Sequence, residues 1–228
     1  MRQPSLRQPA LRQPALQNRA ATGAAGAVIA GIMALHRQPS VDLMTPILEF
    51  LQRRNSAPRL TDPAPSAAQL RAIIGAALRV PDHAWLRPWR FITIAGERRA
   101  ALGELMVQRL QQTDPDADPA MCRKMREAPL RAPLLIVVVV RLTEHPKVPP
   151  IEQRLSAGCA AHAMLLAAEA CGYAGIWRTG AAAFDRGLMA QLGLADNEEI
   201  TGFLYLGTRA GPAKNPPRLD TADFVSSW

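Results

Sequence analysis

Apolar residues from position 44 onward recur at the two spacings that distinguish helices from strands. Groups spaced three and four apart predict helices over residues 45–54, 66–79, 97–111, 152–171 and 185–193, with a further helix ending at residue 127. Runs rich in β-branched and aromatic residues predict strands over residues 89–95, 133–142, 174–178 and 200–206. This order of elements predicts an α+β chain.

The first two predicted helices carry their apolar residues on one side. In the helix over 45–54 that side is formed by Ile47, Leu48 and Leu51. In the helix over 66–79, Ser66 is a typical N-cap residue, and Pro81 ends the pattern because proline cannot continue a helix. For this second helix we expect five residues to point inward: Leu70, Ile73, Ile74, Ala77 and Leu78.

Two segments further along predict the centre of the fold. The run LLIVVVV within residues 133–142 is apolar throughout, which is typical of a strand covered on both faces. The helix over 152–171 ends at Gly172, a typical C′ residue. Because a face of small residues lets another backbone approach closely, we expect this helix at the centre and near a subunit interface. The small residues are Ala157, Gly158, Ala160, Ala161, Ala167 and Ala168.

Residues 1–43 have a different character. The pentads RQPSL at 2–6 and RQPAL at 7–11 and 12–16 place a proline at every fifth position, which forbids a helix. The apolar stretch 21–35 has the composition of a signal-peptide core but is too short for a membrane span. We predict a low-complexity, disordered extension over 1–43 and a folded domain over 44–228, with a targeting role for the extension as the alternative.

Composition and charge narrow the class of protein. The chain has 228 residues, of which 48 % are hydrophobic and 20 % charged, a balance typical of a soluble globular domain. The net charge is +8, but residues 44–228 contain 22 basic and 18 acidic residues, a net charge of +4. This excess suits an anionic small ligand better than nucleic acid, because it forms no basic stripe with interleaved aromatic residues.

Cysteines and histidines do not follow the spacing of a metal site. The three cysteines, Cys122, Cys159 and Cys171, predict buried free thiols and a reducing, cytoplasmic compartment. The four histidines are scattered along the chain. No dinucleotide-binding glycine motif, P-loop, HExxH or GxSxG motif is present. We therefore predict no metal and no protein side chain as the catalytic group.

Three segments carry basic residues where loops meet helices or strands. Such residues can bind the phosphate group of a phosphorylated ligand. The first is Arg53, Arg54, Asn55 and Ser56, for which a solvated helix end is the alternative. The second is LRVPDHAWLRPWRF at 78–91, which contains Arg79 and His83. The third is GIWRTG at 175–180, in which a strand runs into Trp177, Arg178 and Thr179.

Taken together, these segments resemble the nitroreductase family. The resemblance rests on RRNS followed by Arg59, on VPDH before RPW, and on SAGCAAHAM, GIWRTG and GFLYLGT. It covers residues 44–228 in order and none of residues 1–43. It implies an α+β nitroreductase-like fold with a mixed central β-sheet surrounded by helices, and a homodimer with one FMN per site at the interface.

The resemblance also implies roles for individual residues. Arg53, Arg54 and the Asn55/Ser56 pair would bind the FMN phosphate and ribityl chain; Asn55 is an apparent insertion, so either Asn55 or Ser56 takes the hydroxyl position. Arg79 and His83 would reach the same flavin from the partner chain. Trp177, Arg178 and Thr179 would lie beside the isoalloxazine ring. The NAD(P)H side would be formed by Ala167, Ala168, Glu169, Ala170, Cys171 and Gly172.

The implied activity is FMN-dependent oxidation of NAD(P)H. Flavin N5 would accept a hydride and pass it, in a ping-pong sequence, to a nitroaromatic, a quinone or another small acceptor. A non-catalytic FMN-binding or storage protein is the alternative, and a basic nucleic-acid-binding protein is a more distant one. We expect neither nucleic acid nor a membrane as partner.

Overall fold

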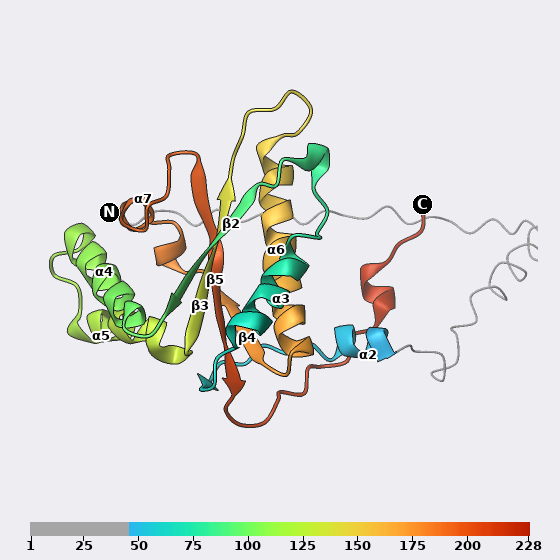
Figure 1. Ribbon diagram of the computed structural model, residues 1–228, viewed down its shortest axis with the longest axis horizontal. Helices are drawn as coiled ribbons and strands as arrows, with labels where there is room; N and C mark the ends of the chain where they lie inside the picture. The colour runs from blue at the N-terminus through green and yellow to red at the C-terminus, as the bar shows by residue number, and fades with distance from the viewer. Residues whose placement is uncertain (1–45) are drawn as a thin grey trace, which may run out of the picture. The chain divides into compact units, whose positions relative to one another are not determined.

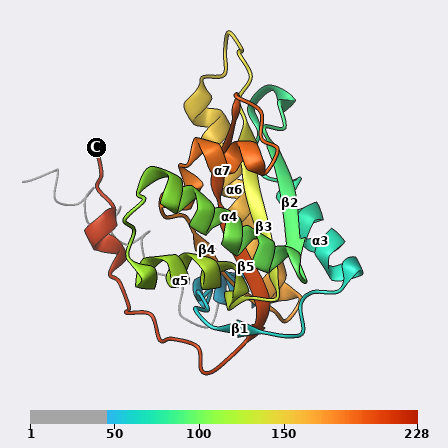
Figure 2. The same cartoon turned by 90° about the vertical axis from the view of Figure 1, so that its left-hand side faces the viewer.

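Five strands form one sheet that carries helices on both faces in the computed structural model, which describes residues 46–228 (Figures 1 and 2). The extension predicted over 1–43 lies outside the described residues. The strands are β1 (Leu60–Thr61), β2 (Trp89–Ala95), β3 (Leu134–Arg141), β4 (Ala174–Arg178) and β5 (Glu198–Arg209). The α-helices are α2 (Pro46–Gln52), α3 (Ala67–Ala77), α4 (Arg98–Thr113), α5 (Pro119–Glu127), α6 (Pro150–Ala170) and α7 (Arg186–Gln191).

The sheet is antiparallel in every pairing of the described strands, so the predicted α+β class is confirmed but the expected mixed sheet is wrong. β3 pairs with both β5 and β2. β5 also pairs with β4 and, at its C-terminal end, with the short β1. The connection β3–α6–β4 does join two strands that run in the same direction. Because β5 bonds to both of them, they are not neighbours, and no parallel pair results.

The core lies on both faces of β3, as its apolar run predicts. Leu135, Val137 and Val139 face a cluster with residues of α4 and α7, whereas Leu134, Ile136 and Val138 face α3 and α6. All six are buried, with at most 4 % of their surface exposed. In Figure 1, α4, α5 and α7 accordingly lie on one side of the sheet and α3 and α6 on the other.

Helix α3 begins as its sequence predicts. Ser66 accepts a hydrogen bond from the Gln69 backbone N–H, and the Gln69 side chain accepts one from the Ser66 N–H, which completes a capping box. The expectation that Leu78 points inward is wrong: the helix ends at Ala77, and Leu78 is 55 % exposed. The predicted apolar side of α2 is exposed as well.

Helix α6 packs with its small residues against the sheet and α3, which places it centrally as predicted. Ala157, Ala160, Ala161 and Ala168 are buried. The cysteines are free, but the expectation that all are buried is wrong, because Cys159 faces outward on α6 and is exposed. Among residues 46–228, no helix combines the length and apolarity needed to cross a bilayer.

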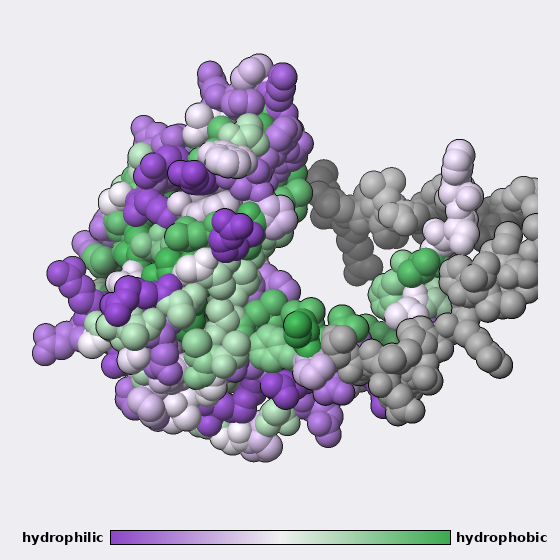
Figure 3. All heavy atoms as spheres, turned by 45° about the vertical axis from the view of Figure 1, so that its right-hand side comes forward, coloured by the Kyte–Doolittle hydropathy of each residue, from purple (hydrophilic) through white to green (hydrophobic). Residues whose placement is uncertain are grey.

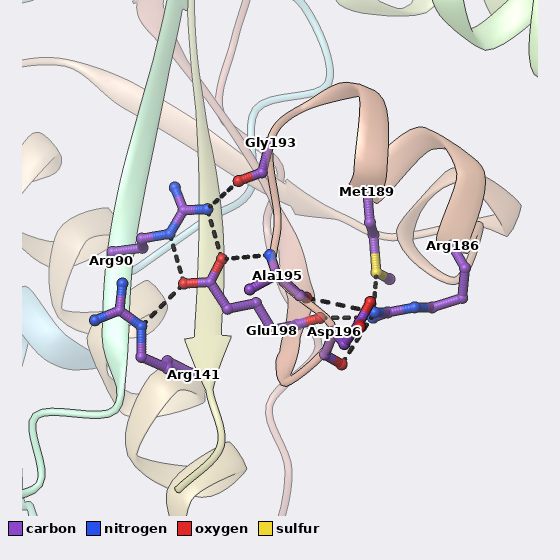
Figure 4. A network of polar contacts seen from close by, with 8 residues as sticks. All are labelled: Arg90, Arg141, Arg186, Met189, Gly193, Ala195, Asp196 and Glu198. Atoms are coloured by element: carbon purple, nitrogen blue, oxygen red, sulfur yellow. Dashed lines mark hydrogen bonds and ion pairs between the residues drawn. The ribbon is translucent and has the colours of Figure 1, made fainter.

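One buried carboxylate joins β2, β3 and the loop before β5 (Figure 4). Glu198, 2 % exposed, accepts hydrogen bonds from Arg90 Nε at 2.7 Å and Nη2 at 2.6 Å, and from Arg141 Nε at 3.0 Å. It also accepts one from the Ala195 backbone N–H. These bonds, above all those from Arg90, lower the pKa of Glu198 to about 2, against the opposing effect of burial. Charge pairing therefore ties three separate segments together at this end of the sheet.

Candidate functional site

The basic segment after α2 is fixed to the C-terminal end of β5. Arg209 at the end of β5 donates a hydrogen bond to the Asn55 carbonyl oxygen at 2.9 Å, and the Asn55 side-chain amide donates to the Lys214 carbonyl oxygen. Arg54 lies 3.5 Å from the Ser56 hydroxyl oxygen. Asn55 therefore ties this segment to two further basic residues that the sequence analysis did not select, Arg209 through its guanidinium and Lys214 through its backbone carbonyl.

Three adjoining pockets begin with the residues that directly follow this segment, Ala57 to Arg59. The first, of about 290 Å³, is lined by residues that include Arg59, Arg209 and Lys214. The second, of about 440 Å³, shares Pro58 and Arg59 with the first and adds Arg131 and Arg178. The third, of about 380 Å³, shares those last two arginines with the second. Because neighbouring pockets share lining residues, they form one row on the surface.

The middle pocket has a concentration of positive charge without counter-charge. Arg59, Arg131 and Arg178 make no ion pair or side-chain hydrogen bond with another described residue. Arg178 Nε is buried and lacks a hydrogen-bond partner among the described atoms. Since a buried donor without an acceptor is costly, this arrangement suits a ligand that brings acceptor or anionic groups.

The third pocket is mostly apolar. Its lining includes Met106, Met125, Phe203 and Tyr205, together with the loop from Thr179 to Ala182. The guanidinium of Arg178 lies 5.7 Å from the centre of the Tyr205 ring. Burial raises the pKa of Tyr205, and the charges of Arg178 and Arg131 oppose that rise. An aromatic ligand with polar groups along one edge fits this combination of walls.

Trp177 and Arg178 point to opposite faces of the sheet, as successive strand residues do. The Trp177 ring lies against Gly202 of β5 and close to Gly158 of α6. A side chain at Gly202 would collide with the indole, so this glycine is required by close packing. Of this pair, therefore, the Arg178 side chain reaches towards Tyr205, whereas the Trp177 indole lies between sheet and helix.

Arg79 and His83 belong to a second location. They lie on the loop that includes η2 (His83–Trp85), at the N-terminal end of α6 (Figure 1). The segment 53–56 lies near the other end of α6, where Ala57 donates a backbone hydrogen bond to Gly175 of β4. The 21 residues of α6 span about 30 Å, so one chain does not bring the two predicted groups together.

The loop that carries His83 is held in an unusual conformation. Ala84, Trp85 and Arg87 have positive φ angles of 57°, 55° and 48°, which are rare for residues other than glycine. Asp82 accepts a hydrogen bond from the Arg87 backbone N–H at 2.8 Å, while its other carboxylate oxygen is buried and unpaired within the described structure. Strained backbone of this kind clusters at functional sites.

The predicted NAD(P)H side is the C-terminal end of α6. Ala168 is buried, while Glu169 is partly exposed and Ala170 is exposed. Gly172 follows with a φ of 84°, the left-handed conformation that ends the helix as predicted. The turn lies at the same end of α6 as the segment 53–56.

Comparison with known proteins agrees with this architecture. The family model "Nitroreductase family" matches residues 51–208. The chain is 43 % identical over 182 residues to "Putative NAD(P)H nitroreductase YdjA" of Escherichia coli K12, which spans 78 % of this chain and 97 % of that protein. It is 35 % identical over 181 residues, with the same coverage, to a Haemophilus influenzae protein of the same descriptive name.

Solved structures share the fold at lower identity. A nitroreductase-like protein from Bacillus cereus superposes with a TM-score of 0.69 at 20 % identity, covering 81 % of this chain and 97 % of the other. A nitroreductase with bound FMN from Bacteroides fragilis gives 0.62 at 22 % identity, covering 81 % and 100 %. The chain belongs to the nitroreductase family, and the resemblance found in its sequence is confirmed.

Proposed function

We propose that this protein is an FMN-dependent NAD(P)H oxidoreductase that works as a homodimer. The observation that carries the proposal is the row of three pockets, which changes from cationic at Arg59, Arg209 and Lys214, next to the segment 53–56, to apolar beyond Arg178. FMN has the matching order of groups, with a phosphate at one end and an aromatic ring at the other. The names of the relatives, and the FMN bound by the Bacteroides fragilis protein, support the same cofactor and co-substrate.

The residues at the cationic end fit a phosphate. Arg53 and Arg54 supply guanidinium groups, and the Asn55 and Ser56 side chains supply shorter donors, as the sequence resemblance implies. Arg209 and Lys214 line the first pocket next to this segment, and Arg209 is bonded to the Asn55 carbonyl oxygen. Sequence reasoning missed these two because they lie more than 150 positions away in the chain, although Arg209, three residues after the predicted last strand, was a basic residue at the end of a strand.

The residues at the apolar end fit the flavin ring. Thr179 and the neighbouring loop backbone would border the ring together with Tyr205, Met106 and Met125. Arg178, Arg131 and Arg59 would offer their unpaired donors to its polar edge. In the bound state FMN supplies the hydride-carrying chemistry, while the cationic edge favours negative charge on the reduced ring.

Two chains are needed to complete this site as proposed. The Arg79/His83 loop and the segment 53–56 lie at opposite ends of α6. In a two-fold symmetric dimer with the two α6 helices antiparallel, the N-terminal end of α6 in one chain lies beside the C-terminal end of α6 in the other. Arg79 and His83 of one chain would then reach the flavin held by the other.

Exposed apolar surface supports such a dimer. Leu78, Trp85, Ile151 and Leu155 are each more than half exposed on the side formed by α3, α6 and the loop between α3 and β2. Figure 3 brings this side forward and shows apolar side chains gathered in patches on it. Residues 210–228 are also exposed throughout and include Phe224 and Trp228. Apolar patches of this kind are typical of protein interfaces.

Anaerobic titration of the purified protein with NADH and NADPH tests the proposal. A flavin absorption spectrum that bleaches on addition of the nicotinamide and returns with a quinone or nitroaromatic supports an oxidoreductase. A flavin spectrum that neither nucleotide bleaches would instead support an FMN-storage protein. Protein purified without FMN, and unable to bind added FMN, would contradict both. The proposed nucleotide side, residues 167–172, predicts that substitutions there change nicotinamide affinity without changing FMN affinity.

A further inference from the structure

We propose that Glu152 is a positioning residue for the flavin site. It would hold the His83 imidazole so that Nε2 is the nitrogen presented to the cofactor bound mainly by the partner chain. The inference rests on the proposed function, because it takes His83 as a flavin contact. Nothing in the sequence motifs selects Glu152, which lies 69 positions from His83 and outside the three basic segments.

The contact itself is short and specific. Glu152 Oε2 lies 2.7 Å from His83 Nδ1. An ionised carboxylate can only accept hydrogen bonds, so the proton of this bond belongs to Nδ1. A histidine held through one ring nitrogen has its tautomer and its ring orientation fixed, and the other nitrogen is left for a ligand. Here the free nitrogen is Nε2.

The first two turns of α6 hold the rest of the loop in the same way. Ser156 lies one helical turn after Glu152 and donates a hydrogen bond from its hydroxyl to the Pro81 carbonyl oxygen at 2.8 Å. Asp82 binds the Arg87 backbone N–H and closes the loop on itself. Two side chains on one face of α6 therefore bind the backbone and the imidazole of a single loop.

The strain in this loop explains why it needs to be held. Ala84, Trp85 and Arg87 all have left-handed backbone angles, and none of them is glycine. Such a conformation persists only where surrounding contacts enforce it. Because His83 and Glu152 are both about half exposed, their ion pair adds little to stability. Its contribution is to the direction of the imidazole.

Helix electrostatics offers a competing account of Glu152. An acidic residue in the first turn of a helix is favourable whatever it touches, because the N-terminal end carries partial positive charge. Glutamine and alanine both remove that charge, but only glutamine keeps an acceptor for the Nδ1–H group. The two substitutions therefore separate the hydrogen bond from the charge.

The test measures FMN dissociation constants of the full-length protein, freed of flavin and titrated with FMN by fluorescence quenching. Glu152→Ala is expected to weaken FMN binding roughly three- to tenfold, the equivalent of one ordinary hydrogen bond. Glu152→Gln should stay within about twofold of the wild type on the same reasoning. Glu104→Ala is the matched control, since it removes the exposed Arg126–Glu104 ion pair, also 2.7 Å long, on α4 and α5.

Two further measurements identify the mechanism. The double variant Glu152→Ala/His83→Ala should bind FMN no more weakly than His83→Ala alone, because Glu152 acts only through the imidazole. Nitrogen-15 NMR of the histidine ring should show Nδ1 as the protonated nitrogen in the wild type and in Glu152→Gln. In Glu152→Ala the other tautomer should appear.

The outcomes separate this inference from the proposed function. If His83→Ala weakens FMN binding and Glu152→Ala does not, Glu152 has no positioning role and the proposed function stands. If Gln and Ala weaken binding equally, the charge is responsible and the positioning role is refuted. If His83→Ala itself binds FMN like the wild type, His83 is not a flavin contact, and both the shared site and this inference are wrong.

Discussion

Replacing Glu198 by glutamine tests whether one buried carboxylate holds the end of the sheet together. In the folded protein the pKa of Glu198 is lowered from 4.5 to about 2, chiefly by hydrogen bonds from Arg90. A depressed pKa contributes stability that is fully present above pH 4.5 and is lost as the pH falls through the folded value. At about 1.4 kcal/mol per pKa unit, this difference corresponds to roughly 3 kcal/mol at neutral pH.

Glutamine retains a similar shape but carries no charge, so Arg90 and Arg141 lose their shared counter-ion. We expect Glu198→Gln to lower the free energy of unfolding by about 3 kcal/mol at pH 7, in line with the loss of one partner from a buried ion pair. The loss should shrink steadily below pH 4.5, because the carboxyl of the unfolded wild-type chain then takes up a proton, and it should vanish only when the folded carboxyl is protonated as well, below about pH 2.

Urea unfolding at pH 7 and near pH 3, at one protein concentration and without added FMN, measures this difference. Glu199→Gln is the matched control: the neighbouring residue pairs with Arg154, but its side chain is 37 % exposed and that of Arg154 is 42 % exposed. An exposed pair is worth about 0.2–1 kcal/mol. Equal losses in the two variants, or a Glu198→Gln loss that is unchanged at low pH, would refute the reasoning.

Three further predictions follow from the proposed site. Arg54→Ala should weaken FMN binding by about 1.5–3 kcal/mol, the value of a charge-assisted hydrogen bond, while the apoprotein stays folded; unchanged affinity in a fluorescence titration would remove Arg54 from the phosphate site. Co-refolding that inactive variant with Arg79→Ala/His83→Ala should restore about a quarter of full NAD(P)H oxidation, because about half of the dimers are mixed and each has one intact site; mixed dimers without activity would exclude a shared site. A protein beginning at Met44 should keep its flavin content, dimer mass and thermal midpoint, and loss of any of these would assign a structural role to residues 1–43.

Local patterns accounted for most of the secondary structure. The strands β2 and β4 have the predicted bounds, and the capping box of α3 follows from Ser66 and Gln69 alone. Both depend on residues that are close together in the chain. The two-residue strand β1 was missed because it exists only through its pairing with the far end of β5, which also extends β5 beyond the predicted 200–206.

The burial of individual residues was less predictable than the secondary structure. Leu78 and Cys159 are both of residue types that are usually buried in a protein core, yet both are exposed. A helical spacing identifies an apolar side but does not say how far a helix continues or which neighbour covers each turn. Leu78 falls just past the end of α3, and Cys159 lies on the side of α6 away from the sheet.

The residues of the candidate site also fall into two groups, those that the sequence selected and those that only the structure added. The basic residues Arg53, Arg54 and Arg178 stand in short motifs, so the sequence could select them. Arg131 stands in no motif, and Tyr205 stands in GFLYLGT, to which the sequence analysis gave no role at the site. Both belong to the site because η3 (Ala128–Arg131) and β5 bring them beside Arg178.

The sequence by itself determined the family, the order of helices and strands, and the cationic motifs, because each depends on residues near one another in the chain. The tertiary structure decided what those motifs face. The sheet sends Trp177 and Arg178 to opposite sides, and α6 separates His83 from Arg54 while bringing Glu152 to it. Such relations depend on how elements distant in sequence pack, since side-chain direction and close approach are set by the pairing of strands and the contacts of helices.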